Sequence, residues 1–164
     1  MINIRPIEEK DWDEVWLIIE PVFRAGETYA FSPNITKEEA FQVWVTAPTA
    51  TYVAVDANEI LVGTYYMKPN QPALGAHVCN CGYIVAARAR GQGIATELCK
   101  HSQFEARTHG FHAMQYNLVV STNEGAIRLW KKLGFEIVGT LLEAFRHPRL
   151  GLVDAHVMYK RLEG

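Results

Sequence analysis

The sequence predicts a single α/β domain (α+β in its arrangement) built on a largely antiparallel sheet. Short runs rich in β-branched and aromatic residues alternate with segments of helical periodicity along all 164 residues. Two of these runs, 51–55 and 60–67, are separated by turn-forming residues, which predicts a β-hairpin. The sequence shows no internal repeat and no linker. Residues 1–164 are therefore expected to form one domain.

The first third of the chain is expected to contain a short strand and two helices. Residues 2–6 alternate like a strand, and apolar residues then recur at helical spacing across 12–23, until Pro21 and Gly26 end that helix. Thr36 and Glu39 form a capping box that begins the second helix. Its buried side is expected to carry Phe41, Trp44 and Val45.

The rest of the chain is expected to alternate strands and helices. After the hairpin and a loop at 69–75, a strand at 77–85 enters a glycine turn, and a helix at 93–109 buries Ile94, Leu98, Cys99 and Ser102. A strand at 112–120 places Met114, Tyr116, Leu118 and Val120 on one side. A short helix at 123–133 stops at Gly134. Strands at 135–140 and 153–159 close the chain around a loop at 146–151.

Composition excludes several classes of protein. Sixteen basic and eighteen acidic residues give a formal charge of −2, which predicts no nucleic-acid partner. No apolar run approaches the roughly 18 residues of a membrane helix, and the first residues lack the features of a signal peptide. We therefore expect a cytoplasmic protein without a membrane partner. Cys79, Cys81 and Cys99 have no metal-binding spacing and are expected to be buried thiols, so no metal site is predicted.

The stretch 85–95 joins a strand to a helix through Gly91 and Gly93. Glycines let a ligand approach the backbone, and the first turn of a helix offers N–H groups without internal partners, so this turn can hold a phosphate. A tight structural turn explains the glycines equally well. A Walker loop is excluded because Ile94 and Ala95 follow Gly93, and a dinucleotide fingerprint would need a third glycine.

Two motifs together resemble the Gcn5-related N-acetyltransferases (GNAT). Arg90-x-x-Gly93-x-Ala95 resembles the acyl-CoA pyrophosphate loop of that family, and the segment 123–135 resembles its second motif. The resemblance implies a mixed, mostly antiparallel sheet of about seven strands splayed in a V, with helices on both faces. It also implies an acetyl-CoA-dependent N-acetyltransferase.

A narrower resemblance concerns the acceptor. The segments 63–70 and 77–82, with 116–119 and Asn123, resemble acetyltransferases of proline analogues such as azetidine-2-carboxylate. This resemblance implies a small amino-acid or imino-acid acceptor, with detoxification as one role.

The family resemblance also implies a cofactor site. Acetyl-CoA would lie between the strands ending at Val85 and containing Asn117, with a backbone N–H near a strand bulge polarising the thioester carbonyl. The implied cofactor-binding residues are Ile84, Val85, Ala86, Arg90, Gly91, Gln92, Gly93, Ile94, Ala95, Thr96, Asn123, Trp130 and Lys132. Arg88 is either a phosphate contact or a solvated turn residue, and helix capping explains Asn123 almost as well as cofactor binding.

The acceptor side and the catalytic groups are less clearly marked. Many family members carry a tyrosine as the acid where this chain has Trp130, whose indole N–H is not a useful acid. His77, Glu27 or a chain of waters are the candidates for the base, and His77 and Asn117 are the residues expected to serve catalysis. Asn80 and Asn117 either bind the substrate or satisfy backbone groups where the strands part. The remaining candidates near the acceptor are Tyr29, Phe31, Arg146 and His147.

Alternatives to this function remain open at the level of sequence. Trp130 and the missing base would also suit an acyl-CoA-binding module with little turnover. Protein N-termini and antibiotics are alternative acceptors within the enzyme class. A homodimer is an alternative to a monomer.

Overall fold

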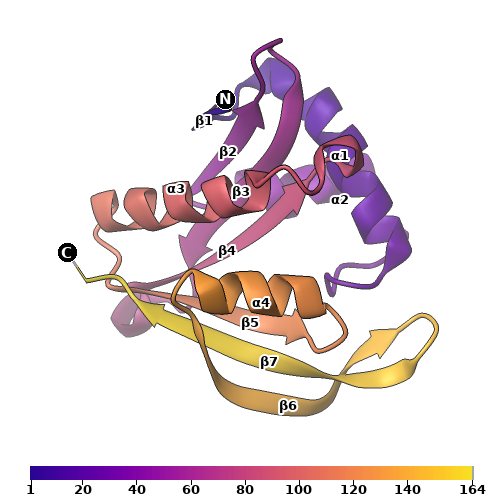
Figure 1. Cartoon of the computed structure of the whole chain (residues 1–164), viewed down its shortest axis with the longest axis vertical. Helices are drawn as coiled ribbons and strands as arrows, with labels where there is room; N and C mark the ends of the chain where they lie inside the picture. The colour runs from indigo at the N-terminus through magenta and orange to yellow at the C-terminus, as the bar shows by residue number, and fades with distance from the viewer. Residues whose placement is uncertain (164) are drawn as a thin grey trace.

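The computed structural model describes residues 1–163 and shows a seven-stranded mixed sheet with four α-helices (Figure 1). The strand order is β1-β2-β3-β4-β5-β7-β6. The strands are β1 (Asn3–Pro6), β2 (Ala50–Val55), β3 (Leu61–Pro69), β4 (Val78–Val85), β5 (Ala113–Val120), β6 (Glu136–His147) and β7 (Gly151–Arg161). The helices are α1 (Trp12–Ala25), α2 (Lys37–Phe41), α3 (Ile94–Thr108) and α4 (Glu124–Lys132). This architecture confirms the expected fold class.

The central strands β4 and β5 part soon after they begin. They are the parallel neighbours in the sheet, and their pairing covers only Val78 with Ala113 and Cys79 with Met114. Every other neighbouring pair is antiparallel. Beyond Cys79 the two strands diverge, as the ribbons of Figure 1 show. The sheet therefore has the expected V, closed at the beginning of β4 and open at its end.

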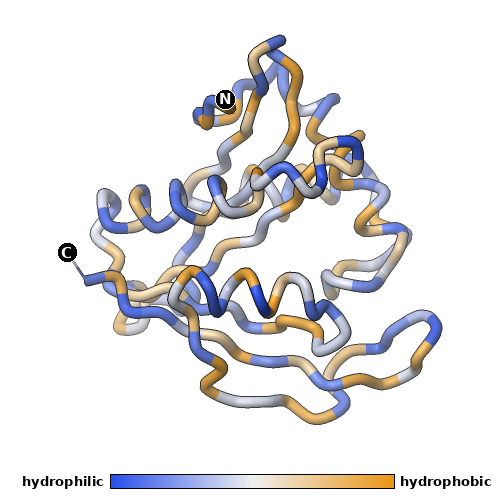
Figure 2. Tube along the Cα trace, in the orientation of Figure 1, coloured by the Kyte–Doolittle hydropathy of each residue, from blue (hydrophilic) through white to orange (hydrophobic). Residues whose placement is uncertain are grey.

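Helices cover both faces of the sheet. Successive residues of a strand point to opposite faces, and on β3 Tyr65 contacts His101 of α3, whereas Tyr66 packs edge-on against Trp44 after α2. Trp130 of α4 packs against Tyr83 on the α3 face. Hydrophobic and hydrophilic residues alternate along α4 (Figure 2), as expected for a helix with one face on the sheet. Helices α3 and α4 therefore cover one face of the sheet, and α1 and α2 cover the other.

The first helix differs from the expected one at Pro21, which lies inside α1 rather than ending it. A proline removes the N–H that would bond to the carbonyl four residues earlier. That residue is Leu17, which is 69% exposed, so water can reach its carbonyl. Gly26 ends the helix with a positive φ of 65°, as expected.

The second helix begins at the expected capping box but is short. Thr36 Oγ1 accepts a hydrogen bond from the Glu39 N–H, and Glu39 returns one to the Thr36 N–H. The α-helix passes into a single π-helical turn, Gln42–Thr46. Of the three residues expected to be buried, Trp44 is fully buried, and Phe41 and Val45 are half-buried.

A bulge in β5 overturns the simple alternation expected for this strand. Its register with β7 shifts between Tyr116 and Val119, and Val119 and Val120 are both buried. An extra residue re-aims the side chains that follow it, so Leu118 is only half-buried. Asn117, at the bulge, is exposed.

The last two strands are longer than expected. β6 continues to His147 and β7 begins at Gly151, so Arg146 and His147 lie in a strand and the connecting turn is only 148–150. Their pairing shifts register twice, once between Leu141 and Phe145. These irregularities broke the periodic pattern from which the ends were predicted.

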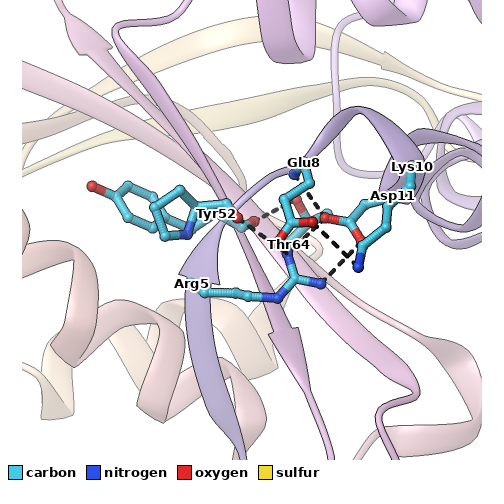
Figure 3. A network of polar contacts seen from close by, with 7 residues as sticks. Arg5, Glu8, Lys10, Asp11, Tyr52 and Thr64 are labelled. Carbon is cyan, nitrogen blue, oxygen red and sulfur yellow. Dashed lines mark hydrogen bonds and ion pairs between the residues drawn. The ribbon is translucent and has the colours of Figure 1, made fainter.

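A buried ion pair anchors the start of α1 to β1. Arg5 donates two hydrogen bonds to the Asp11 carboxylate, at 2.7 and 3.0 Å, and the Glu8 N–H donates a third at 2.7 Å (Figure 3). Asp11 is 4% exposed. The hydrogen bonds from Arg5 hold the pKa of Asp11 below its usual value.

Two further expectations concern helices and cysteines. Across residues 1–163, no helix is both long and apolar enough to cross a membrane. Cys79, Cys81 and Cys99 are free and buried, as expected.

Candidate active site

A cleft of about 940 Å³ lies where β4 and β5 part. It passes through the opening of the sheet from the α3 and α4 side to the α1 side. Its walls are the end of α1 with residues 27–31, parts of β3, β4 and β5, and the first turns of α4. Residues from each side of the V therefore meet at one site.

The glycine turn forms one end of this cleft. Gly91 and Gly93 have φ values of 78° and 79°, and a Cβ built on either would meet nothing within 4 Å. No side chain caps α3, so the first N–H groups of that helix are available to a ligand. Arg90 and Ala95 line the cleft beside them. Open backbone and a positive helix end suit a pyrophosphate.

The predicted cofactor-binding residues are not all in the cleft. Ile84, Val85, Arg90, Ala95, Asn123 and Trp130 line it. Gly91, Gln92 and Gly93 are exposed beside it, and Ala86 and Thr96 lie next to lining residues. Ile94 is buried against β3, close to Gly63. Lys132 is exposed at the end of α4 and does not line the cleft.

The strand pairing determines which β4 amides face the opening. Ala86 donates its N–H to the Val62 carbonyl at 2.8 Å. In an antiparallel pair, the backbone hydrogen bonds to a given neighbouring strand come from every second residue. Ile84 therefore points its N–H toward β3, and Val85 and Tyr83 point theirs into the opening. The bulge expected in this strand is absent from its pairing with β3, which runs without a shift from Val85 to Cys79. Val85, rather than Ile84, has the free amide.

Two residues with alternative interpretations have structural partners. Arg88 donates to the Leu61 carbonyl and does not line the cleft. Asn123 caps α4, accepting from the Ala126 N–H at 3.4 Å, and also lines the cleft. Asn123 can therefore cap α4 and contact a ligand at the same time. For Arg88, a contact with a ligand in the cleft is not supported.

An aromatic cluster lies on the α4 side of the cleft. Trp130 has its ring centroid 5.1 Å from those of Tyr83 and Tyr116. Tyr116 donates a hydrogen bond to the Tyr83 hydroxyl at 2.9 Å, which lies 2.6 Å from Ser102 Oγ. Burial raises the pKa of both phenols well above the usual value, so they stay protonated. The sequence did not mark Tyr83, because an aromatic residue in a strand is usually core.

Asn80 and Tyr66 meet on the α1 side. Tyr66 donates to Asn80 Oδ1 at 3.1 Å, and Asn80 Nδ2 donates to the Gln115 carbonyl of β5 at 2.9 Å. Asn80 is 7% exposed and still lines the cleft. A side-chain amide nitrogen has two N–H groups, and Gln115 takes one of them. The ring of Tyr66 lies over Gly82, where a Cβ would be 2.4 Å from its Cε2.

Asn117 faces the same side from β5. Its Oδ1 accepts from Gln115 Nε2 at 3.0 Å, and its Nδ2 donates to Asn70 Oδ1 at 2.6 Å. The β5 bulge leaves Asn117 exposed and lining the cleft. The structure therefore brings Asn80 and Asn117 to one cleft from opposite strands.

Tyr29 and Phe31 close the cleft from the loop after α1. Their rings stack with centroids 6.0 Å apart and an interplanar angle of 11°. Tyr29 donates its hydroxyl to the Tyr83 carbonyl at 2.9 Å, so it occupies a β4 acceptor that has no strand partner. Burial raises the pKa of the Tyr29 phenol well above its usual value. Both residues line the cleft.

Charges in the cleft are few. Among residues 1–163, the charged side chains that line it are Glu27, Lys68 and Arg90. Glu27 is paired with Arg149 of the β6–β7 turn at 2.7 Å. Lys68 Nζ lies 5.4 Å from the Tyr66 ring centroid. Lys68 was not predicted as a site residue, because a single lysine at the end of a strand gives no sequence signal.

Three other candidates lie away from the cleft. His77 precedes β4 and packs against His112, with ring centroids 6.0 Å apart, at the closed end of the V. Val85 lies eight positions further along the extended chain, or about 26 Å away. His147 is buried and accepts from the N–H groups of Arg149 and Leu150. Neither histidine nor Arg146 lines the cleft.

The mixed sheet, its splayed central strands and the uncapped glycine turn fit a domain that binds an acyl-CoA. A family model described as the acetyltransferase (GNAT) family matches residues 11–135. The chain is 32% identical over 148 residues to the N-acetyltransferase aca1 of Schizosaccharomyces pombe, covering 80% of this chain and 71% of aca1. This protein belongs to the GNAT acetyltransferase family and is an acetyl-CoA-dependent N-acetyltransferase.

Solved structures agree with this assignment. A GCN5-related N-acetyltransferase from Kribbella flavida is 42% identical, with a TM-score of 0.93, and the match covers 98% of this chain and 97% of that one. A GNAT superfamily phosphinothricin acetyltransferase from Sinorhizobium meliloti, solved with AcCoA, is 18% identical. Its TM-score is 0.85, with coverage of 98% and 88%. The second likeness supports the fold.

Proposed function

We propose that this acetyltransferase acetylates the amine of a small amino-acid or imino-acid acceptor. The observation that carries the proposal is the α1 side of the cleft, where the amides of Asn80 and Asn117 stand beside aromatic rings. An acceptor with several positive charges would need unpaired carboxylates. Within residues 1–163, Glu27 is the one acidic residue lining the cleft, and Arg149 pairs with it.

The cofactor site follows from the glycine turn. The N–H groups from Gly91 to Thr96 bind the pyrophosphate, with Arg90 beside them. Val85 directs its N–H at the thioester carbonyl and stabilises the negative charge that develops on its oxygen. Asn123 and Trp130 line the path of the pantetheine arm. Acetyl-CoA supplies the electrophilic carbonyl, and the chain supplies its position.

The acceptor enters from the α1 side. Tyr66 and Gln115 hold the Asn80 amide, and Asn70 and Gln115 hold that of Asn117, so both are oriented before the acceptor arrives. Their remaining N–H groups bind the acceptor. Asn117 holds the acceptor in place for attack and takes no proton from its amine, while Tyr29 and Phe31 exclude water. His77, Arg146 and His147 do not line the cleft, so they have no role at the acceptor.

A strong base is needed less for such an acceptor than for a protein lysine. A peptide α-amine with a pKa of about 8 is roughly one-tenth neutral at pH 7, a lysine side chain at about 10.4 is neutral in about one molecule in 2,500, and free amino acids fall between these limits. The neutral amine forms the C–N bond as the C–S bond breaks. The nitrogen loses one proton to water, and the thiolate gains one. Positioning supplies most of the rate.

One further observation supports the finer assignment. The segments 63–70 and 77–82, which resemble proline-analogue acetyltransferases, provide Lys68, Asn70, Asn80 and Gly82 around one part of the cleft. Cytoplasmic location and a homodimer stay predictions of the sequence. Size-exclusion chromatography with light scattering tests the homodimer.

A thiol-release assay tests the function. The protein is incubated with acetyl-CoA and a panel of amino acids, proline analogues, polyamines, aminoglycosides and peptides. We expect amino acids or proline analogues to give the highest kcat/KM. Binding of acetyl-CoA without amine-stimulated thiol release would indicate a binding module instead. Preference for peptides or aminoglycosides would move the acceptor to the alternative classes.

A further inference from the structure

Lys68 is a cation within the cleft whose charge has no acidic partner. It is half-buried and comes from β3. None of the ion pairs among residues 1–163 includes it. A partly desolvated ammonium without a counter-ion is costly, and an anionic ligand would offset that cost.

The position of the ammonium follows from three contacts. Lys68 is the register partner of Asn80 on the neighbouring strand, so their side chains share the α1 face. Its Nζ lies 5.4 Å from the centroid of the Tyr66 ring. That ring covers Gly82, the residue next to Tyr83, whose amide faces the opening. Lys68 therefore leans toward the open end of the V, where the thioester and the amine would meet.

Resting on the function proposed above, we propose that Lys68 binds the carboxylate of a free amino-acid or imino-acid acceptor. In such an acceptor the carboxyl carbon is two bonds from the amine nitrogen, so an amine near the β4 amides brings its carboxylate toward Lys68. Asn80 adds an amide N–H beside it. The acceptor is then recognised by a carboxylate next to its amine, which neither a peptide with a distant C-terminus nor a polyamine provides.

The same charge favours the reactive form of the acceptor. A nearby cation disfavours an ammonium and lowers its pKa. Glu27 cannot fully cancel this effect, because Arg149 pairs with it. Lys68 thus attracts the carboxylate and increases the neutral fraction of the amine.

The experiment compares three forms of the best amino-acid acceptor from the panel: the free acid, its carboxamide and its decarboxylated amine. Each is assayed with wild type, Lys68→Met, Lys68→Arg and Lys10→Met. Lys10 is exposed and does not line the cleft, so its variant controls for the loss of one positive charge. Thermal unfolding and the KM for acetyl-CoA show whether each variant is folded and binds the cofactor.

We expect wild type to prefer the free acid over the carboxamide by at least tenfold in kcat/KM. Lys68→Met should raise the KM for the free acid at least tenfold, leave the KM for acetyl-CoA within about twofold, and abolish the preference. Lys68→Arg should retain most of it. A preference that survives Lys68→Met, or a best acceptor without a carboxylate, would overturn the assignment while leaving amine acetylation intact. If no amine is acetylated, both proposals fail.

Discussion

Asn80 Nδ2 donates a hydrogen bond to the carbonyl oxygen of Gln115, 2.9 Å across the point where β4 and β5 separate. In a continuous parallel ladder, that carbonyl would accept from a backbone N–H. A side-chain amide replaces the missing partner, and Tyr66 fixes its orientation. Asn80 therefore both joins β4 to β5 where they separate and lines the cleft between them.

Replacing Asn80 should affect both stability and acceptor binding. Asn80→Ala leaves the Gln115 carbonyl and the Tyr66 hydroxyl without this partner, which should cost about 1–3 kcal/mol of unfolding free energy. The KM for the acceptor should rise much more than that for acetyl-CoA, and Asn117→Ala should do the same with a smaller loss of stability. Urea unfolding and steady-state kinetics measure the two effects. Asn58→Ala, in the exposed hairpin turn, is the control, and equal changes in both KM values would remove the asparagines from the acceptor site.

Alanine at Gly91 or Gly93 should weaken cofactor binding. Both have positive φ values, and an alanine in that conformation costs roughly 1–2 kcal/mol, which the turn can avoid by changing shape. The amides would then no longer converge on the pyrophosphate. We expect the KM for acetyl-CoA to rise about tenfold, with the acceptor KM changed less. Gly139→Ala, also in open space but without a positive φ, is the matched control. An unchanged KM in the Gly93 variant would mean that the turn is only structural.

Most of the fold could be predicted because periodicity and capping are local signals. The box at Thr36 and the glycine stops after α1 and α4 appear where the sequence placed them. The prediction that Pro21 ends the first helix was wrong because the effect of the proline depends on whether water reaches the Leu17 carbonyl, which the sequence does not reveal. The alternation predicted for β5 was wrong because a bulge depends on how two strands pair, which the sequence of one strand does not show.

The site was predictable to the extent that backbone motifs define it. Asn123 lines the cleft and Gly91 and Gly93 lie beside it, because a strand, a turn and a helix end are encoded in neighbouring residues. Lys68 could not be found this way, since its role depends on a register partner twelve positions away and on the absence of a counter-ion. His77 does not line the cleft because it lies just before β4, at the closed end of the V, whereas the cleft lies at the other end of that strand.

The carboxylate of Asp11 should stabilise the fold in a pH-dependent manner. Arg5 lowers its pKa in the folded state, so the stabilisation is present above the ordinary carboxyl range near pH 4 and is lost as the pH falls through the lower folded value. Asp11→Asn should cost about 1–3 kcal/mol at pH 7. Urea unfolding at pH 7 and at pH 3 should show the gap from wild type shrinking in acid. Asp13→Asn, which alters an exposed pair, should change little, and a gap that is constant with pH would contradict the role of the charge.

The pH dependence of the reaction should follow the acceptor rather than the protein. The cleft side chains that could act as a base are limited, since Glu27 is paired with Arg149 and His77 is remote. Burial keeps the phenols of Tyr83 and Tyr116 protonated well above the usual tyrosine pKa. We therefore expect kcat/KM to rise with pH up to the amine pKa of the acceptor and to show no decline from these phenols below about pH 10.

Two acceptors whose amines differ in pKa by at least one unit separate the explanations. With no protein base, the rising limb of the pH profile moves by the difference between the two amine pKa values. Tyr116→Phe, which removes the hydroxyl bonded to Tyr83, should leave the position of this limb unchanged. A limb at one fixed pH for both acceptors would show that a group of the protein removes the proton. Its shift in Glu27→Gln would then identify Glu27 as that group.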